Sequence, residues 1–362
     1  MVREKMLLTV LILGITVLLI QSAPATAQEE EKEAEPIFIP KQVKAELEQG
    51  MENLTPRMDI PFEIFENIYL PARQNIHSIF LFKAKNKDLG FSSSSSVSEE
   101  KKEGESEAQQ AFTEPDKLVT SLNAFLWFQQ MSGDYSQEVY VPVQLEEGKD
   151  SYDPEEGFMY SIGYPLPPGK YLLAMAVTTK DLQKIGTQYY EFELPAPSRF
   201  TDNLGTTPIF FIRNIEQMES PETTPKIHKG FFTYSVLKIV PVLENVFAQK
   251  DSLDVFFYVF GAEPDPETNK YNLTANYELT QDEEVIVRYA EGTYDAPIIS
   301  QPLYLKRTVL VQTKKGDEVV EEKKETRDIE PGQYIFVIEL KDNISGKTLE
   351  KKVNITVVAN EE

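Results

Sequence analysis

The chain has 362 residues, and 59 acidic against 36 basic side chains give a formal net charge of -23. Nucleic-acid binding needs a basic patch that neutralises phosphates, so this balance argues against nucleic acid, and likewise against anionic membrane surfaces, as partners. The absence of cysteine excludes disulfides, thiol catalysis and a lipid-modified N-terminal cysteine. A secreted chain without disulfides depends on core burial, which modules of more than about a hundred residues can supply.

The first 27 residues read as a signal peptide. Arg3 and Lys5 precede an uncharged apolar run at residues 6–20, and Ala25-Thr26-Ala27 offers small residues for cleavage. The run is shorter than the roughly 20 residues of a spanning helix. The alternative of an uncleaved anchor is disfavoured because the Ala-x-Ala site lies where cleavage is expected. We therefore predict a periplasmic or extracellular protein without an integral membrane segment after cleavage.

Residues 28–57 are predicted to form an acidic leader followed by one short helix. The leader, 28–36, is mostly Glu and Ala and reads as a solvated charge run. Val43, Leu47 and Met51 recur at i, i+4 and i+8, which indicates one apolar helix face between residues 41 and 51. So short a helix is not stable alone, so we expect it to pack on the first module or to fray.

The first module is predicted at residues 58–197. Its composition is interrupted at residues 92–110, a run rich in Ser, Glu and Lys that cannot bury enough apolar surface to fold, and we predict a disordered loop there. The strands that we expect on either side of this loop are Ile76–Phe82, Leu122–Phe128 and Val139–Leu145.

Residues 198–228 are predicted to join the two modules. This segment is rich in turn residues, but Pro208–Ile212 is too apolar for a free linker. We expect it to pair with one module or to wedge between both, and so to limit their relative motion.

The second module is predicted at residues 229–358. Leu253–Phe260 corresponds to the early strand of the first module, and further strands are expected at 272–279 and 284–289. Residues 308–312 and 318–322 flank Lys314-Lys315-Gly316-Asp317, which predicts a hairpin with Gly316 at a positive-φ position.

A strand-end pattern occurs twice. Pro168-Gly169-Lys170-Tyr171 recurs 163 residues later as Pro331-Gly332-Gln333-Tyr334, and the apolar alternation that follows keeps the same register. The pattern predicts two closing hairpins of one design. With short alternating runs, frequent turn signals and many Tyr and Phe residues, it indicates an all-β fold of two tandem immunoglobulin-like β-sandwiches.

These residues carry a family resemblance. The stretch 166–194, and more closely 330–347, resembles the closing hairpin of immunoglobulin-like modules in secreted bacterial proteins. Residues 246–260 and 270–277 are similar to the β-rich regions that accompany the GWxTD domain and von Willebrand A-type domains. The GWxTD motif itself and the Asp-x-Ser-x-Ser metal-adhesion signature are absent. The resemblance therefore implies a secreted or envelope protein without assigned chemistry.

No catalytic constellation stands out. A Ser-His-Asp arrangement needs a histidine, and the only two are His77, at an early strand, and His228, beside Lys226 and Lys229. We interpret both as ordinary surface or loop residues. No Gly-x-Ser-x-Gly nucleophile elbow occurs. We predict no catalytic residue, no cofactor and no enzymatic activity.

Metal and glycan sites are weighed in the same way. Zinc prefers Cys and His ligands, and the two histidines are too far apart in the sequence to favour a zinc site. Two acidic groups are considered for calcium: the first is Asp265, Glu267 and Asn269, and the second is the run 150–156. Neither has the EF-hand spacing. Solvated turns explain both groups better. The aromatic residues considered as a glycan platform are Trp127, Tyr135, Tyr152 and Tyr160. Trp127 alternates with Phe125 on a strand, so a core role is favoured.

The sequence as a whole favours a non-enzymatic interaction or scaffold protein, with an unidentified envelope or secreted protein as its partner. An unprotected sheet edge would bind that partner by strand addition. The alternative is a module that binds a glycan or a small ligand in a concave site.

Overall fold

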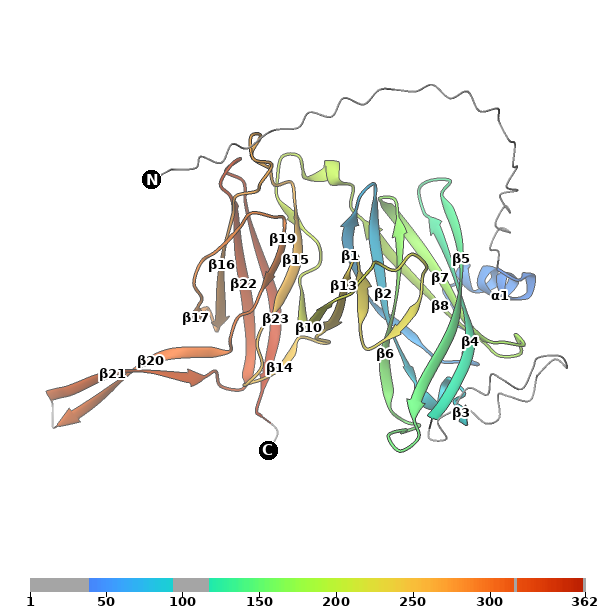
Figure 1. The fold of residues 1–362 in the computed structure, drawn as a ribbon, viewed down its shortest axis with the longest axis horizontal. Helices are drawn as coiled ribbons and strands as arrows, with labels where there is room; N and C mark the ends of the chain where they lie inside the picture. The colour runs from blue at the N-terminus through green and yellow to red at the C-terminus, as the bar shows by residue number, and fades with distance from the viewer. Residues whose placement is uncertain (1–38, 94–116, 316–317, 361–362) are drawn as a thin grey trace, which may run out of the picture. The chain divides into compact units, whose positions relative to one another are not determined.

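The computed structural model describes residues 39–93, 117–315 and 318–360. The chain divides into two units, Met1–Pro36 and Ile37–Glu362, and every described residue belongs to the second. Strands dominate this unit, which confirms the predicted all-β fold (Figure 1). The predicted signal peptide, the acidic leader and most of the predicted loop 92–110 lie outside the described residues. Ser92 and Ser93 of that loop form a short strand that pairs with Leu118 and Val119.

The first sandwich consists of two antiparallel sheets, ordered β1-β2-β6-β11 and β5-β4-β7-β8, with β3 also paired to β4. The chain forms β1 and β2 in one sheet, β4 and β5 in the other, returns to the first sheet with β6 and ends in the second with β7 and β8, which is the order of an immunoglobulin-like sandwich. Short 3₁₀ turns follow β2 and β8, at Asn86–Asp88 and Pro197–Phe200. The strands of this sandwich are β1 Glu63–Ala72, β2 Asn75–Lys85, β3 Ser92–Ser93, β4 Lys117–Gln130, β5 Ser136–Gly148, β6 Gly157–Leu166, β7 Gly169–Thr179, β8 Ile185–Leu194 and β11 Ile227–Lys229.

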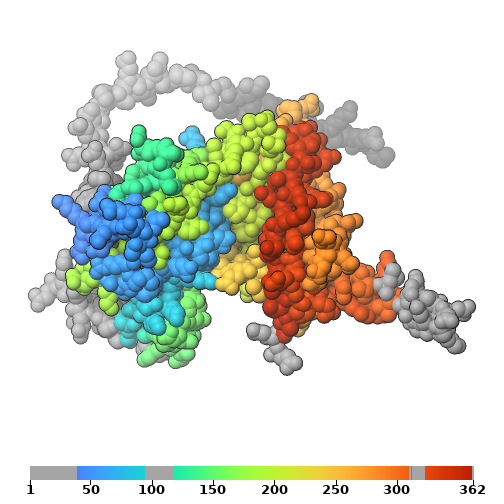
Figure 2. Space-filling view, turned by 180° about the vertical axis from the view of Figure 1, so that it is seen from behind, coloured from blue at the N-terminus to red at the C-terminus, as the bar shows by residue number. Residues whose placement is uncertain are grey.

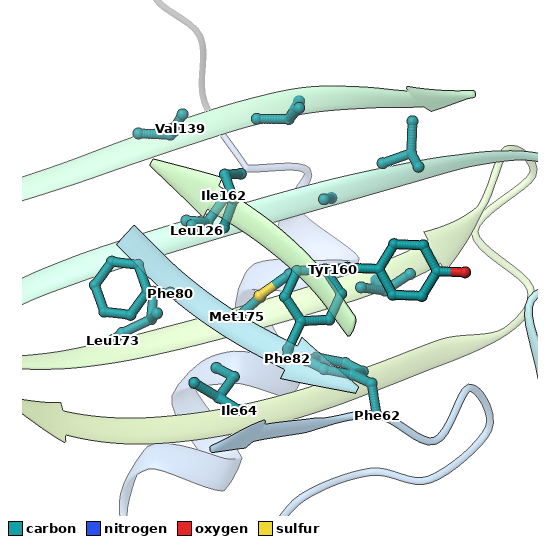
Figure 3. Packing of buried hydrophobic residues seen from close by; sticks show 14 of the residues in the cluster. Phe62, Ile64, Phe80, Phe82, Leu126, Val139, Tyr160, Ile162, Leu173 and Met175 are labelled. Atoms are coloured by element: carbon teal, nitrogen blue, oxygen red, sulfur yellow. The ribbon is translucent and has the colours of Figure 1, made fainter. Parts of the chain in front are cut away.

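The core of the first sandwich follows from the two-residue period of its strands. Phe80 and Phe82 of β2 point inward together with Tyr160 and Ile162 of β6, and they meet Leu126 of β4 from the opposite sheet (Figure 3). Successive strand residues face opposite sides of a sheet, so this alternation places one apolar set between the two sheets.

The second sandwich also has two sheets. One has the order β12-β13-β10-β15-β19, with β9 beside β15, and the other has the order β14-β23-β22-β16-β17, with β18 beside β16. A separate two-stranded sheet, β20-β21, is inserted between β19 and β22. The strands are β9 Gly205–Thr206, β10 Phe210–Gln217, β12 Phe232–Tyr234, β13 Leu237–Pro241, β14 Val246–Ala248, β15 Val255–Phe260, β16 Leu273–Gln281, β17 Glu284–Arg288, β18 Gly292–Tyr294, β19 Ile298–Gln301, β20 Lys306–Lys315, β21 Glu318–Asp328, β22 Gly332–Asp342 and β23 Thr348–Val358.

The repeated strand-end pattern forms two closing hairpins of the same design, as predicted. Gly169 pairs with Leu194 in β7-β8, and Gly332 pairs with Val357 in β22-β23, which is the same register displaced by 163 residues. Each tyrosine hydroxyl donates to a carbonyl four residues earlier: the Tyr171 bond is 2.8 Å and the Tyr334 bond is 2.7 Å. This tyrosine corner explains why the pattern places Tyr at the start of the strand.

The two sandwiches meet face to face through a shared apolar layer. Ile79 and Leu81, on the outer face of β2, belong to one buried cluster with Phe210 of β10 and Phe256 of β15. In this contact region, β2 and β15 are therefore buried on both faces. The predicted inter-module segment 198–228 lies in this region, and it contributes strands as well as connecting the two sandwiches.

This segment supplies strands to both sandwiches. β10 pairs with β13 and β15, so the second sandwich begins before the predicted boundary at 229. β11 then adds to β6 of the first sandwich, and β12 adds to β13 of the second. Gly230 lies between β11 and β12 with φ of 78°, a conformation that glycine adopts without strain.

The predicted helix is α1, Lys41–Met51, and it lies on the outer face of the sheet β5-β4-β7-β8. Val43 and Leu47 are fully buried there against Phe125 and Trp127. The second sandwich differs, because residues of β22 and β23, coloured red, lie open at the surface in Figure 2. Within the described ranges, no helix is long and apolar enough to cross a bilayer.

Candidate binding sites

A cleft lies where the β1-β2 turn of the first sandwich faces the segment that carries β11 and β12. Two adjoining hollows, of about 760 and 500 Å³, share His77, Pro165, Glu222 and Thr233 in their walls. His228 lines the smaller hollow. We refer to the two hollows together as the junction cleft. The fold thus brings both histidines of the chain to one place, which the sequence did not indicate.

Glu222 is the centre of a polar cluster in this cleft. Its Oε2 lies 2.8 Å from Nε2 of His228 and accepts a 3.0 Å bond from the Thr233 hydroxyl. Its Oε1 accepts a 3.3 Å bond from Nζ of Lys226. Burial alone would raise the pKa of Glu222, but the charge of His228 and these hydrogen bonds outweigh it and lower the pKa. The cluster therefore holds an ionised carboxylate.

His77 occupies a more apolar position in the same cleft. Its ring lies over Gly163, where an added Cβ would come within 2.5 Å of Nε2, so a glycine is required there. Burial lowers the pKa of His77, and a hydrogen bond with the Thr233 backbone opposes this only in part. His77 is therefore neutral at pH 7, and it packs against Tyr234 with ring centroids 6.2 Å apart.

The cleft contains a serine opposite a histidine, but they are not joined as a nucleophile and base. Ser161 pairs with His228 across β6 and β11. The buried Ser161 hydroxyl donates a 2.6 Å bond to the carbonyl of Phe231, and Nε2 of His228 is engaged by Glu222. A triad needs the serine hydroxyl to donate to the imidazole. The observed bonds instead hold the 222–233 segment against the first sandwich.

The mouth of the larger hollow carries polar groups suited to a ligand. Arg73, Gln74 and Asn75 of the β1-β2 turn line it, and Arg73 has a φ of 45°. A positive φ is unfavourable for a non-glycine residue, and such strain is concentrated at functional sites. Among the described residues the Arg73 guanidinium has no hydrogen-bond or ion-pair partner.

A second candidate surface is the hairpin β20-β21. Its strands pair with each other from Lys306–Asp328 to Lys315–Glu318, with a bulge between Thr313 and Lys314. This confirms the predicted hairpin, although Gly316 and Asp317 lie outside the described residues. Neither strand has another hydrogen-bonded strand beside it within the described chain. Both outer edges thus present free backbone donors and acceptors.

The acidic groups considered for calcium are engaged with protein groups. Oδ1 of Asp265 accepts bonds from the backbone N–H groups of Glu267 and Thr268, at 3.0 and 2.8 Å, which is a turn-stabilising arrangement. Glu155 pairs with Lys85 and Lys87. In the part of the chain that the structure describes, no group of three or more His, Asp or Glu side chains is arranged to hold a metal ion.

The aromatic residues considered as a glycan platform do not form one surface. Trp127 is buried under α1, where its Nε1 donates a 2.9 Å bond to Ser136 and Nζ of Lys44 lies 4.7 Å from its ring. Tyr160 is 1% exposed in the core, and burial raises the pKa of its hydroxyl. Tyr135 packs against the same core, whereas Tyr152 stacks edge-on with Phe91. Core packing therefore accounts for Trp127, as the sequence favoured.

Comparison with known proteins adds little to this geometry. No protein-family model and no curated protein matches the chain. Two crystal structures of Salmonella alpha-2-macroglobulin, one a mutant and one reacted with methylamine, are 9% identical to it with TM-scores of 0.15. The two matches cover 88% and 82% of this chain, but only 17% and 16% of the macroglobulin chains.

A structure of the M60 catalytic domain with two CBM51 domains from Clostridium perfringens ZmpB is also 9% identical to this chain, with a TM-score of 0.11. The match covers 85% of this chain and 40% of the ZmpB chain. The chain thus spans less than half the length of each of these structures. Likenesses this weak carry no conclusion about function, and none of them bears on the resemblance to GWxTD-associated regions.

Proposed function

We propose that this chain is a non-enzymatic interaction protein of the periplasm or the extracellular space, and that it binds another envelope or secreted protein by strand addition to β20-β21. The observation that carries the proposal is the pairing of these two strands with each other alone in the described chain. An extended segment of a partner would complete the hydrogen bonding of an open edge and so extend the sheet.

The most suitable edge is the first half of β20. Thr308–Gln312 contains no Pro and no Lys, and it ends before the bulge at Thr313/Lys314. Lysine, proline and bulges are the devices by which proteins protect an edge from pairing. This five-residue stretch therefore lacks the features that would block a partner strand.

Three other edges of the described chain carry features that hinder strand addition. β5 contains Pro142 opposite Asn123. The start of β8 is covered, because the backbone N–H of Thr187 donates to the carbonyl of Arg57 at 2.9 Å. The end of β23 is paired in parallel with β14. The contrast with β20 favours the hairpin as the interaction edge.

The test is affinity capture of partners from the native envelope after crosslinking. Three baits are compared: the unsubstituted chain, Val309→Pro and Leu310→Pro. Successive backbone N–H groups of a strand point to opposite sides, so one of these two substitutions removes an outward donor. We expect a reproducible partner in the unsubstituted chain and its loss in one of the two variants. Lys352→Pro, on the edge of β23, serves as the matched control and should retain the partner.

Thermal unfolding of each variant separates lost binding from lost folding. Within the described chain no other strand is hydrogen-bonded to the hairpin, so we expect Val309→Pro to leave the main unfolding transition in place. Capture that is equal in all variants would contradict strand addition at β20.

A second candidate function is the binding of a glycan or other small ligand in the junction cleft. The observation that favours it is Arg73, which has no partner in the described part of the chain and lies on a strained turn at the mouth of a hollow of about 760 Å³. Ligands that bind only the folded state raise its melting temperature. We expect a screen of neutral and acidic oligosaccharides to give such a rise, and the rise to disappear in Arg73→Gly, which also relieves the positive φ.

A further inference from the structure

A groove of about 320 Å³ lies at the base of the β20-β21 hairpin, between β17 and β20. Its walls are residues 286–289 on one side and Tyr304 and 306–308 on the other. Three of these wall residues, Arg288, Lys306 and Arg307, are basic, and none is acidic. In a chain with 59 acidic and 36 basic residues, such a local excess of positive charge is unusual. We call this site the basal groove.

Two of the three basic side chains are not neutralised within the described part of the protein. Among the described residues, neither the Lys306 ammonium nor the Arg307 guanidinium has a hydrogen-bond or ion-pair partner. Nε of Arg307 is buried and has no acceptor among these residues. A buried donor without an acceptor destabilises the folded protein unless another molecule supplies one. The Arg307 side chain as a whole is half-buried and lines the groove, so its terminal N–H groups are the donors that an anionic ligand would meet.

The third basic residue is partly neutralised. Nε of Arg288 donates a 2.6 Å bond to Oε1 of Glu278. Its guanidinium retains further N–H donors, because one arginine carries five. A ligand carboxylate would therefore meet one paired cation and two cations that lack a partner in the described chain.

Two tyrosines give the groove an apolar side. Tyr304 is 65% exposed, the largest value among the exposed large hydrophobic residues of the described chain. Tyr289 donates a 3.1 Å bond to the carbonyl of Tyr304 and so fixes the segment that carries it. Tyrosine combined with arginine is typical of protein-binding surfaces, in which an aromatic side chain packs and a guanidinium selects charge.

We propose that the basal groove binds an acidic, extended peptide segment of the partner, with Arg307 as the residue that recognises a carboxylate. This inference rests on the proposed function, since the groove continues into the open edge of β20 at Thr308. A segment that pairs with β20 would pass the groove and place alternate side chains in it. The free backbone edge favours a peptide over an anionic polysaccharide, which has no amide groups to pair with a strand.

The experiment measures fluorescence anisotropy with three probes and the full exported chain. The probes are a labelled octapeptide that alternates Val and Glu, the same peptide with Gln in place of Glu, and a labelled oligogalacturonate. The variants are Arg307→Gln and Lys306→Gln. Lys352→Gln, which removes an equal charge from β23, is the control, because Nζ of Lys352 pairs with Glu350.

We expect the Glu peptide to bind about tenfold more tightly than the Gln peptide, because charge-assisted hydrogen bonds are roughly twice as strong as neutral ones. Arg307→Gln should remove most of this preference, Lys306→Gln about half of it, and Lys352→Gln none. Raising the salt concentration should weaken the preference, since partly exposed charges are screened. Unchanged melting temperatures would show that the variants are folded.

Three results would overturn the inference: equal binding of the Glu and Gln peptides, a preference that survives Arg307→Gln, or oligogalacturonate binding more tightly than the Glu peptide. The proposed function is tested separately by the proline substitutions in β20. If those abolish partner capture while Arg307→Gln does not weaken it, strand addition stands and the basal groove is not the recognition site. If Arg307→Gln weakens binding of the Glu peptide but the proline substitutions have no effect on partner capture, the basal groove stands as a binding site and strand addition at β20 does not.

Discussion

The two sandwiches share a closing hairpin but differ in what covers their outer sheets. In the first, Ala176 of β7 is fully buried, because α1 packs over that face. The equivalent residue of the second, Glu339 of β22, is exposed. The same backbone register thus accepts opposite side-chain types. This difference teaches that the hairpin pattern specifies the framework, whereas a covering element decides whether the outer face is apolar.

The sandwiches differ again at the connection before the tyrosine corner. In the first, only Pro167 and Pro168 separate β6 from β7. In the second, residues 302–331 separate β19 from β22 and include the hairpin β20-β21. The N–H of Ile329 donates to the carbonyl of Leu305 at 3.0 Å and closes the base of this insertion. An insertion whose ends meet leaves the framework intact, so a new binding edge could be added without disturbing the core.

The largest effect should come from breaking the layer that both sandwiches share. Phe256→Ala removes a side chain that is 1% exposed and should cost about 3–5 kcal/mol of unfolding free energy. Denaturant titration should also resolve two transitions, because the sandwiches would lose their coupling. Ile335→Ala, at a residue 40% exposed, is the matched control, and we expect it to change stability little. An equal loss in both variants would contradict the coupling.

The next effect sharpens the contrast between the outer faces. Leu47→Ala on α1 should cost about 2 kcal/mol or more, because a buried leucine is truncated. Glu339→Ala on the open face of β22 should stay within about 0.5 kcal/mol. Hydrogen exchange of α1 should rise selectively in Leu47→Ala. Unaltered protection of α1 would show that its docking does not depend on this face.

The tyrosine corners should respond equally. Tyr171→Phe and Tyr334→Phe each remove one hydrogen bond and should each cost about 1 kcal/mol. The sites lie in different cores, so the double variant should show the sum of the two losses. Chemical denaturation of the three variants tests this. A loss confined to Tyr171→Phe would mean that the insertion before β22 has made the second corner dispensable.

The smallest effect concerns pH in the junction cleft. Burial lowers the pKa of His77 below 6.5, so the unfolded chain binds more protons than the folded chain as the pH falls through that value. The stability of the protein should therefore decrease on acidification in this range. His77→Gln should flatten that dependence, measured as melting temperature against pH. An unchanged slope would show that groups other than His77 control it.

Several elements were predictable from local pattern. The helix at 41–51 follows from Val43 and Leu47 on one face, and the paired closing hairpins follow from two Pro-Gly-x-Tyr strand starts. The apolar run Ile79-Phe80-Leu81-Phe82 carried a further signal, because a strand buried on both faces loses its polar alternation. That signal could have predicted a covered sheet, although not the sheet that covers it.

The sites were less accessible to prediction. The sequence favoured ordinary surface or loop roles for His77 and His228, yet both line one cleft. The basal groove likewise combines Arg288 of β17 with Arg307 of the inserted strand β20. The spacing of residues along the chain does not show which distant residues come to lie in the same cleft or groove.

The sequence by itself determined the all-β class, the helix and the register of both hairpins, because turn chemistry and strand alternation act between neighbouring residues. Only the tertiary structure decided that Phe210, Phe256 and Leu81 meet in one layer, and that β20 keeps an open edge. Those outcomes depend on which apolar faces find each other. The hydrophobic effect stabilises any complementary apolar contact and is not directional. A one-dimensional pattern therefore cannot specify which apolar face packs against which.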